Sequence, residues 1–121
     1  MVIGIGADIV KVSRIRRFIG REEERPLDLI LTSKEAQSRK NAHSVAGVFA
    51  VKEALLKALG IGFSRGLGRL LEIEVLKDDI GKPYVVTSGV VSEILFEKKI
   101  SCIEVSISHD TDYAVAFVIC Q

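Results

Sequence analysis

Cysteine, net charge and long apolar runs are all scarce in this chain, and each scarcity excludes a class of protein. Only two cysteines occur, Cys102 and Cys120, without CxxC spacing, so we expect free thiols in a reducing cytoplasm rather than a disulfide scaffold. The 17 basic and 16 acidic residues leave a formal net charge of +1, which recruits neither nucleic acid nor a membrane by bulk attraction. No export signal and no uncharged run of bilayer-spanning length is present. We therefore expect a cytoplasmic protein that is neither exported nor membrane-spanning.

The size and the apolar content indicate one folded domain. The 121 residues amount to 13.2 kDa, which suits a single hydrophobic core over residues 1–121. Hydrophobic residues make up 48% of the chain, which argues against disorder. That fraction also leaves little polar area to cover an isolated monomer, so we expect another subunit to cover part of the surface.

Periodicity and breakers predict an α+β fold with an antiparallel sheet packed against helices. In residues 2–10, isoleucines alternate with Gly4, Gly6 and Asp8, which is typical of a strand with Asp8 on the face opposite the isoleucines. A first helix is expected after Ser13 as its N-cap and ends at Pro26 at the latest, and a second short helix begins at the capping box of Thr32 and Glu35. A third is expected at 43–59, where Gly60 closes it, and a fourth at 88–99. Strands are expected at 71–77, 83–86, 102–108 and 113–120. Short turns between neighbouring strands favour antiparallel pairing.

Three charges interrupt the apolar helix that contains "FAVKEALLKALG": Lys52, Glu53 and Lys57. The simplest interpretation is a solvent-facing stripe in which Glu53 and Lys57 form an i,i+4 pair. A second interpretation joins Glu53 to Asp8, whose glycine neighbours leave room for a ligand. Two carboxylates flanked by lysines suit Mg²⁺, which takes one or two protein carboxylates together with water and phosphate oxygens. The glycine-rich run after the helix would let backbone amides approach phosphates, and together these features predict a metal and phosphate site.

Four ordered segments, "GIGADI", "FAVKEALLKALG", "GKPYV" and "VSISHDTDYAVA", resemble the bacterial holo-acyl-carrier-protein synthase family of small 4′-phosphopantetheinyl transferases. The resemblance covers nearly the whole chain. It implies transfer of the phosphopantetheine arm of coenzyme A to a serine of apo acyl carrier protein, which leaves adenosine 3′,5′-bisphosphate. It also implies that Asp8 and Glu53 bind Mg²⁺ and that Lys57 neutralises the departing phosphate, so these three residues are the expected catalytic set. The serine proton would go either to Glu53 or to a metal-bound water.

The resemblance further implies the residues that bind coenzyme A: Lys52, Lys57, Gly60, Gly62 and His109. Lys52 has an alternative role, because it could instead hold its helix against a neighbour. Between the two glycines, an isoleucine replaces the threonine common in the family. His109 could be a general base or a structural turn residue, but the family match assigns it to the nucleotide end of coenzyme A.

Two further residues have competing interpretations. Glu35 matches an acidic position of the family that could orient a water molecule, but the capping box explains it fully. His43 has no counterpart with a role in the family, and we expect it on the surface at the start of its helix.

The first helix is rich in cations, namely Lys11, Arg14, Arg16, Arg17 and Arg21. Of these, Arg14, Arg17 and Arg21 share one stripe of the helix. By itself such a stripe is most often a solvated face. The resemblance implies that Arg14, Arg17 and Arg21 receive the acidic helix of acyl carrier protein, with association that weakens in salt. It also implies a homotrimer with active sites at subunit interfaces.

Two other classes of protein compete with the transferase. A non-catalytic module that binds a nucleotide and an acidic protein would use the glycine-rich run and the basic helix, but would need neither Asp8 nor Glu53. A nucleic-acid-binding protein could use the arginines, but aromatic residues make up only 6% of the chain and its charges almost balance. We therefore expect no nucleic acid among the partners.

Overall fold

A central helix, α3 (Ala42–Ala58), organises the fold in this computed structural model, which describes residues 1–19, 26–39, 41–61 and 67–121. The Asn41 side chain caps its start by accepting a hydrogen bond from the Ser44 amide at 2.8 Å. Its end lies at Leu59, followed by Gly60 with a φ of 73°. Every residue from Val45 to Leu56 is buried. The helix therefore lies within the core, as its apolar sequence indicates.

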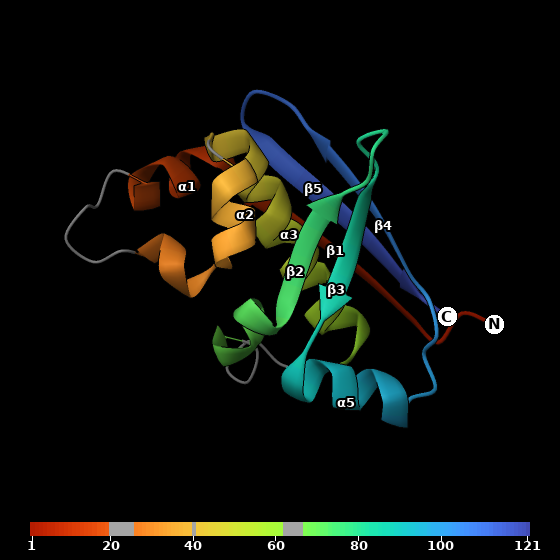
Figure 1. Ribbon diagram of the computed structural model, residues 1–121. Coiled ribbons are helices and arrows are strands. Elements are labelled where there is room, and N and C mark those ends of the chain that lie inside the picture. Colours follow the sequence, from red (N-terminus) through yellow and green to blue (C-terminus); the bar gives the residue numbers. More distant parts are fainter. Residues whose placement is uncertain (20–25, 40, 62–66) are drawn as a thin grey trace.

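The sheets are antiparallel throughout. One contains β1 (Gly4–Lys11), β5 (Tyr113–Cys120) and β4 (Ile103–His109) in the order β1-β5-β4, and the other pairs β2 (Ile73–Lys77) with β3 (Pro83–Thr87). Helix α3 packs against all three strands of the first sheet and also contacts α1 (Val12–Ile19) and β2 (Figure 1). The predicted α+β class with an antiparallel sheet on helices is confirmed.

The remaining elements are short: η1 (Pro26–Leu29), α2 (Ser33–Ser38), η2 (Leu67–Glu72) and α5 (Gly89–Glu97). The capping box of α2 is present as predicted, with Thr32 and Glu35 each binding the other's backbone. The prediction of Ser13 as an N-cap is wrong, because α1 already begins at Val12. The strand runs directly into this helix, and the Val12 amide donates instead to the Asp112 carbonyl at 2.8 Å.

The glycines of β1 bring the strand unusually close to α3. A Cβ on Gly4 would lie 2.3 Å from the Ala58 carbonyl oxygen, and one on Gly6 would lie 1.8 Å from the Ala54 oxygen. The expectation that these glycines leave room for a ligand is therefore wrong, because the helix backbone fills that space. Asp8 is the next inward-facing position of the strand, so the close approach places its side chain beside α3.

The outer face of the three-stranded sheet is apolar and exposed across β1 and β5. Ile5 and Phe117 have exposed fractions of 72% and 59%, and Ile5 pairs with Ile119 while Ala7 pairs with Phe117. Such a continuous apolar face is uncommon on a monomer and typically marks an interaction site. Among the described residues, no helix combines the length and apolar character needed to cross a membrane.

Candidate active site

Asp8 and Lys57 form an ion pair where β1 meets the last turn of α3. The Lys57 Nζ lies 2.9 Å from Asp8 Oδ1 and also donates to the Ala7 carbonyl oxygen at 3.1 Å. The lysine side chain is 55% exposed and the aspartate side chain 15% exposed. The close strand and helix thus hold a carboxylate and an ammonium together at the protein surface.

Glu53 lies one helical turn before Lys57 and is almost entirely buried, with 8% of its surface exposed. Burial raises the pKa of its carboxyl group, and the negative charge of Asp8 raises it further, while the cations Lys57 and Arg14 oppose the shift. Within the described residues, no hydrogen bond to this carboxylate is found. The structure therefore brings together Asp8, Glu53 and Lys57, the three residues predicted as catalytic, and adds Arg14 to their surroundings.

These carboxylates fit a hard divalent cation. The negative charge of Asp8 disfavours ionisation of Glu53 and helps to raise its pKa, and a cation between the two would remove that repulsion. The described residues contain no group of three or more histidine, cysteine or acidic side chains that could hold a metal, so a cation placed here would have two carboxylates as its donors from the described residues. Mg²⁺ accepts such a set and fills its other positions with water and phosphate oxygens. The chemistry of Asp8 and Glu53 is thus the chemistry that the predicted Mg²⁺ site requires.

Lys52 lies on the opposite, internal side of α3. Its side chain is fully buried, its Nζ lies 2.7 Å from Glu35 Oε1, and it also donates to the Ile30 carbonyl. The expectation that Lys52 binds coenzyme A is corrected here, because an ammonium enclosed in this way cannot reach a ligand outside. It holds α3 against α2, the alternative role that the sequence left open.

Glu35 is also fully buried, and its carboxylate is occupied by hydrogen bonds within the protein. Besides Lys52, its carboxylate accepts from the Thr32 amide and from the Val75 amide, each at 2.8 Å. These contacts support the capping interpretation and leave no oxygen for orienting a water at the surface.

Only part of the predicted phosphate loop lies within the described residues. Gly60 follows α3 with a φ of 73°, and a Cβ there would meet no atom within 4 Å. Its conformation, not a lack of space, favours glycine at this position. Gly62 lies outside the described residues.

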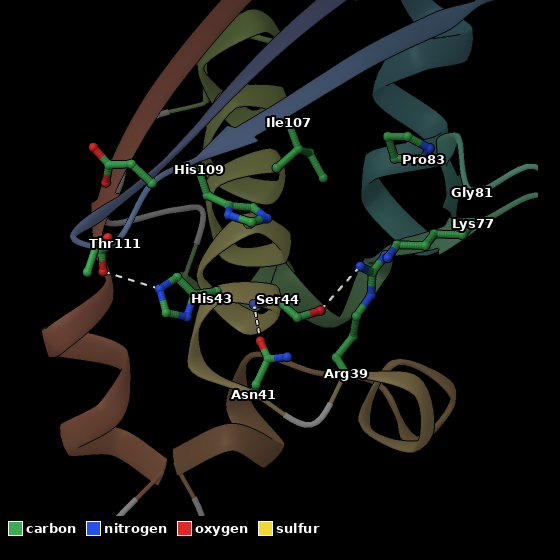
Figure 2. Close-up of a pocket in the computed structure, with 12 residues that line it drawn as sticks. Arg39, Asn41, His43, Ser44, Lys77, Gly81, Pro83, Ile107, His109 and Thr111 are labelled. Atoms are coloured by element: carbon green, nitrogen blue, oxygen red, sulfur yellow. Dashed lines mark hydrogen bonds between the residues drawn. The ribbon is translucent and has the colours of Figure 1, made fainter.

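Polar and charged side chains also line a cavity of about 750 Å³ at the start of α3 (Figure 2). His109, the last residue of β4, lines it together with His43, and their ring centroids are 5.9 Å apart. Arg39 and Lys77 also line it, whereas Asp8, Glu53 and Lys57 do not. His43 is the second residue of α3, so its predicted place at the start of a helix is confirmed, and from there it also lines this cavity.

The sequence did not predict that Arg39, His43 and Lys77 would line one cavity. They come from the end of α2, the start of α3 and the end of β2, so no local spacing joins them. The one signal available was the "GKPYV" segment, whose turn brings Gly81 and Pro83 to the same cavity.

The basic helix α1 is exposed where the sequence predicts a docking surface. Arg14 and Arg17 are both exposed, and the charge of Arg14 reaches Glu53. Arg21 lies outside the described residues. The described part of the stripe therefore begins beside the two carboxylates.

Comparison with known proteins agrees with this geometry. Residues 4–118 match the 4′-phosphopantetheinyl transferase superfamily. A holo-acyl-carrier-protein synthase of Fusobacterium nucleatum is 44% identical over 124 residues, covering 98% of each chain. The corresponding synthase of Alkaliphilus metalliredigens is 42% identical over 120 residues, covering 96% of each chain.

Solved structures give the same result. The crystal structure of the synthase from Neisseria meningitidis has a TM-score of 0.87 at 34% identity and covers 100% of this chain and 99% of its own. The Helicobacter pylori synthase in complex with coenzyme A has a TM-score of 0.80 at 32% identity, covering 97% and 99%. The chain belongs to the 4′-phosphopantetheinyl transferase superfamily and, within it, to the holo-acyl-carrier-protein synthase family of enzymes.

Proposed function

We propose that this enzyme transfers 4′-phosphopantetheine from coenzyme A to a serine of apo acyl carrier protein in a Mg²⁺-dependent reaction. The observation that carries the proposal is the convergence of Asp8, Glu53 and Lys57 from β1 and α3. The relatives named holo-acyl-carrier-protein synthase support the reaction, and the solved complex with coenzyme A supports the donor.

The reaction breaks the phosphoanhydride bond of the pyrophosphate and forms a phosphoester bond to the serine. The serine oxygen bonds to the phosphorus that carries the pantetheine arm, the bond from that phosphorus to the adenylate oxygen breaks, and adenosine 3′,5′-bisphosphate leaves. Catalysis of such a transfer depends mainly on positioning and charge neutralisation. Asp8 and Glu53 would hold Mg²⁺, which supplies Lewis-acid stabilisation of the phosphoryl oxygens when bound.

The chain's own residues supply the remaining functions. The ammonium of Lys57 is exposed enough to contact a phosphate and neutralises the charge that develops on the leaving group. Glu53 has a raised pKa and no hydrogen bond from the described residues, so one of its oxygens can accept the serine proton. Burial around Glu53 strengthens both effects by excluding water.

The exposed arginines of α1 give the carrier protein its docking surface. Acyl carrier protein presents an acidic helix beside its serine, and Arg14 and Arg17 offer complementary charge. Because Arg14 also acts on Glu53, a partner docked on α1 places its serine near the two carboxylates.

A homotrimer explains two separate features of the chain. The apolar outer sheet face around Ile5 and Phe117 needs a cover, and a second copy supplies an apolar one. The cavity beside His109 is not lined by Asp8 or Glu53. We infer that coenzyme A spans an interface, with its nucleotide end in this cavity of one subunit and its pyrophosphate at the carboxylates of the next. The cytoplasmic location stays a prediction.

The decisive experiment is the intact mass of apo acyl carrier protein after incubation with the enzyme, coenzyme A and Mg²⁺. We expect a gain of one phosphopantetheine, release of adenosine 3′,5′-bisphosphate, and neither product in EDTA. No gain with several folded carrier proteins would overturn the proposal and favour a non-catalytic nucleotide-binding module. A full gain in EDTA would overturn the role of the metal.

A further inference from the structure

A groove with a cationic wall lies between α2 and the hairpin of β2 and β3, and we call it the α2 groove. Its volume is about 400 Å³. Lys34, Arg39 and Lys77 line it, and none of its lining residues in the described part of the chain is acidic. The groove is a different space from the 750 Å³ cavity, although Arg39 and Lys77 line both. It therefore has a positive wall that the site described above does not explain.

One side of the α2 groove is a polar face of α2. Lys34, Gln37 and Ser38 are spaced i, i+3 and i+4, which places them on the same side of the helix. All three residues are exposed. This face offers an ammonium, an amide and a hydroxyl group to a ligand.

The other side of the α2 groove is a small apolar platform on the hairpin. Leu76 and Tyr84 are cross-strand partners, so their side chains lie on the same face of the hairpin. Tyr84 is 42% exposed, which leaves its ring available for stacking. Glu74 lies two residues before Leu76 on the same strand, but its carboxylate accepts a hydrogen bond from Thr32 Oγ1 at 2.6 Å. The platform is thus apolar and aromatic beside a cationic wall.

Arg39 gives the α2 groove a buried charge. Only 7% of its surface is exposed, and its guanidinium donates to Ser44 Oγ and to the Val75 carbonyl oxygen, both at the long distance of 3.4 Å. No ion pair with Arg39 occurs in the part of the chain that the structure describes. Burial lowers its pKa, and the charge of Glu35 only partly opposes this effect. A buried cation with neutral partners is costly, and an anion in the groove would offset that cost.

We propose that the α2 groove is a second ligand site, which binds a nucleoside phosphate. The phosphate lies against Lys34, Arg39 and Lys77, and the base stacks on Tyr84. This class of ligand combines the anion that the wall requires with the planar ring that the platform accepts, and the volume is in the range of small-molecule sites. The site goes beyond the proposed transfer reaction, because none of the three predicted catalytic residues lines it.

The test is a calorimetric titration of adenosine 5′-monophosphate into enzyme saturated with coenzyme A, in EDTA and without carrier protein. Coenzyme A then fills the site proposed for it, so the heat reports a second site. We expect binding, and we expect adenosine and inorganic phosphate to bind at least about tenfold more weakly, since each lacks one half of the ligand. Stacking tolerates any base, so the absence of binding overturns the proposal. Equally tight binding of adenosine or of inorganic phosphate overturns a nucleoside phosphate as the ligand.

Variants confined to the α2 groove locate the site. Tyr84→Ala removes the stacking ring and should weaken binding of the monophosphate by at least about fivefold, whereas Tyr84→Phe should keep it within about twofold. Lys34→Glu reverses an exposed charge of the wall and should also weaken binding at least about fivefold. Lys98→Glu is the matched control, since Lys98 is exposed and outside the groove, and it should leave the affinity unchanged.

The affinity for coenzyme A separates this site from the 750 Å³ cavity. Neither Lys34 nor Tyr84 lines that cavity, so their variants should bind coenzyme A within about twofold of the unaltered enzyme. Equal losses for both ligands, or binding of the monophosphate that neither Lys34→Glu nor Tyr84→Ala weakens, overturn the α2 groove as the site. Tyr84-dependent binding in an enzyme that never modifies a carrier protein supports this inference and overturns the proposed reaction alone.

Discussion

The ammonium of Lys52 lies 2.7 Å from the carboxylate of Glu35, and neither side chain is exposed to solvent. The next residue along the helix, Glu53, contributes instead to the site with Asp8 on β1. Two adjacent charges of α3 thus have different surroundings: Lys52 holds the helix in place from inside, and Glu53 lies beside Asp8 at the proposed active site. The interior pair fixes the rotation of α3 and, with it, the direction of Glu53.

Removing the buried ammonium should destabilise the enzyme strongly. Lys52→Met leaves the Glu35 carboxylate buried without its cation, which costs about 3–5 kcal/mol of unfolding free energy. The matched control is Lys57→Met on the same helix, whose pair is exposed and should cost only about 0–1 kcal/mol. Urea unfolding measures both variants. Similar losses for the two would show that burial of the Lys52 pair contributes nothing.

Glu53→Gln should inactivate the enzyme and stabilise its fold. We expect activity to fall at least about 100-fold, because the several kcal/mol of charge stabilisation supplied through the metal are lost. The folded-state pKa of Glu53 is raised, so its ionisation opposes folding. The stability of the unaltered enzyme relative to the glutamine variant is therefore greatest below the ordinary glutamate pKa and falls as pH rises through the folded pKa.

Metal-free thermal melts across pH measure this effect. The glutamine variant should gain in relative melting temperature from acid to neutral pH. A constant difference across that range would contradict the raised pKa, and full activity of the folded variant would exclude Glu53 from the site.

Local signals in the sequence explain why much of the fold was predictable. The capping box of Thr32 and Glu35 fixes the start of α2, and Gly60, which adopts a positive φ, follows the end of α3. Each signal involves only a few adjacent residues and acts without help from tertiary structure. Alternation in the first strand placed Asp8 opposite the isoleucines. The resemblance of four segments to a known family then joined Asp8 to Glu53.

The rest depends on contacts between distant segments. Lys52 and Lys57 lie on one helix, and only the packing of α2 distinguishes the buried lysine from the exposed one. The cavity with Arg39 and His43 forms where α2, β2 and β4 end and α3 begins, so no spacing in the sequence predicts it. Ser13 failed as a cap because a distant hairpin supplies the acceptor for the first helical amide.

Gly6→Ala should disrupt the contact that aligns Asp8 with α3. The added Cβ would lie 1.8 Å from the Ala54 carbonyl oxygen, and a backbone atom cannot rotate away as a side chain can. We expect a loss of at least about 1–3 kcal/mol, as for overpacked cores, and weaker metal-dependent activity. Gly68→Ala is the control, because its Cβ would meet no atom within 4 Å. Chemical unfolding of the pair tests the prediction, and equal stabilities would contradict it.

A charge on the outer sheet face should dissociate the proposed trimer. Phe117 is 59% exposed and lies opposite Ala7 at the centre of the apolar face, so Phe117→Glu would bury an unpaired carboxylate in each interface. Phe96→Glu is the matched control, since Phe96 is 85% exposed on α5. Sedimentation velocity should find a trimer for the unaltered enzyme and the control, but a folded monomer for Phe117→Glu. Because we place coenzyme A across the interface, that monomer should also lose transfer activity by at least about tenfold, the effect of a lost contact worth about 1.4 kcal/mol. A fully active monomer would instead mean that one subunit holds the whole site.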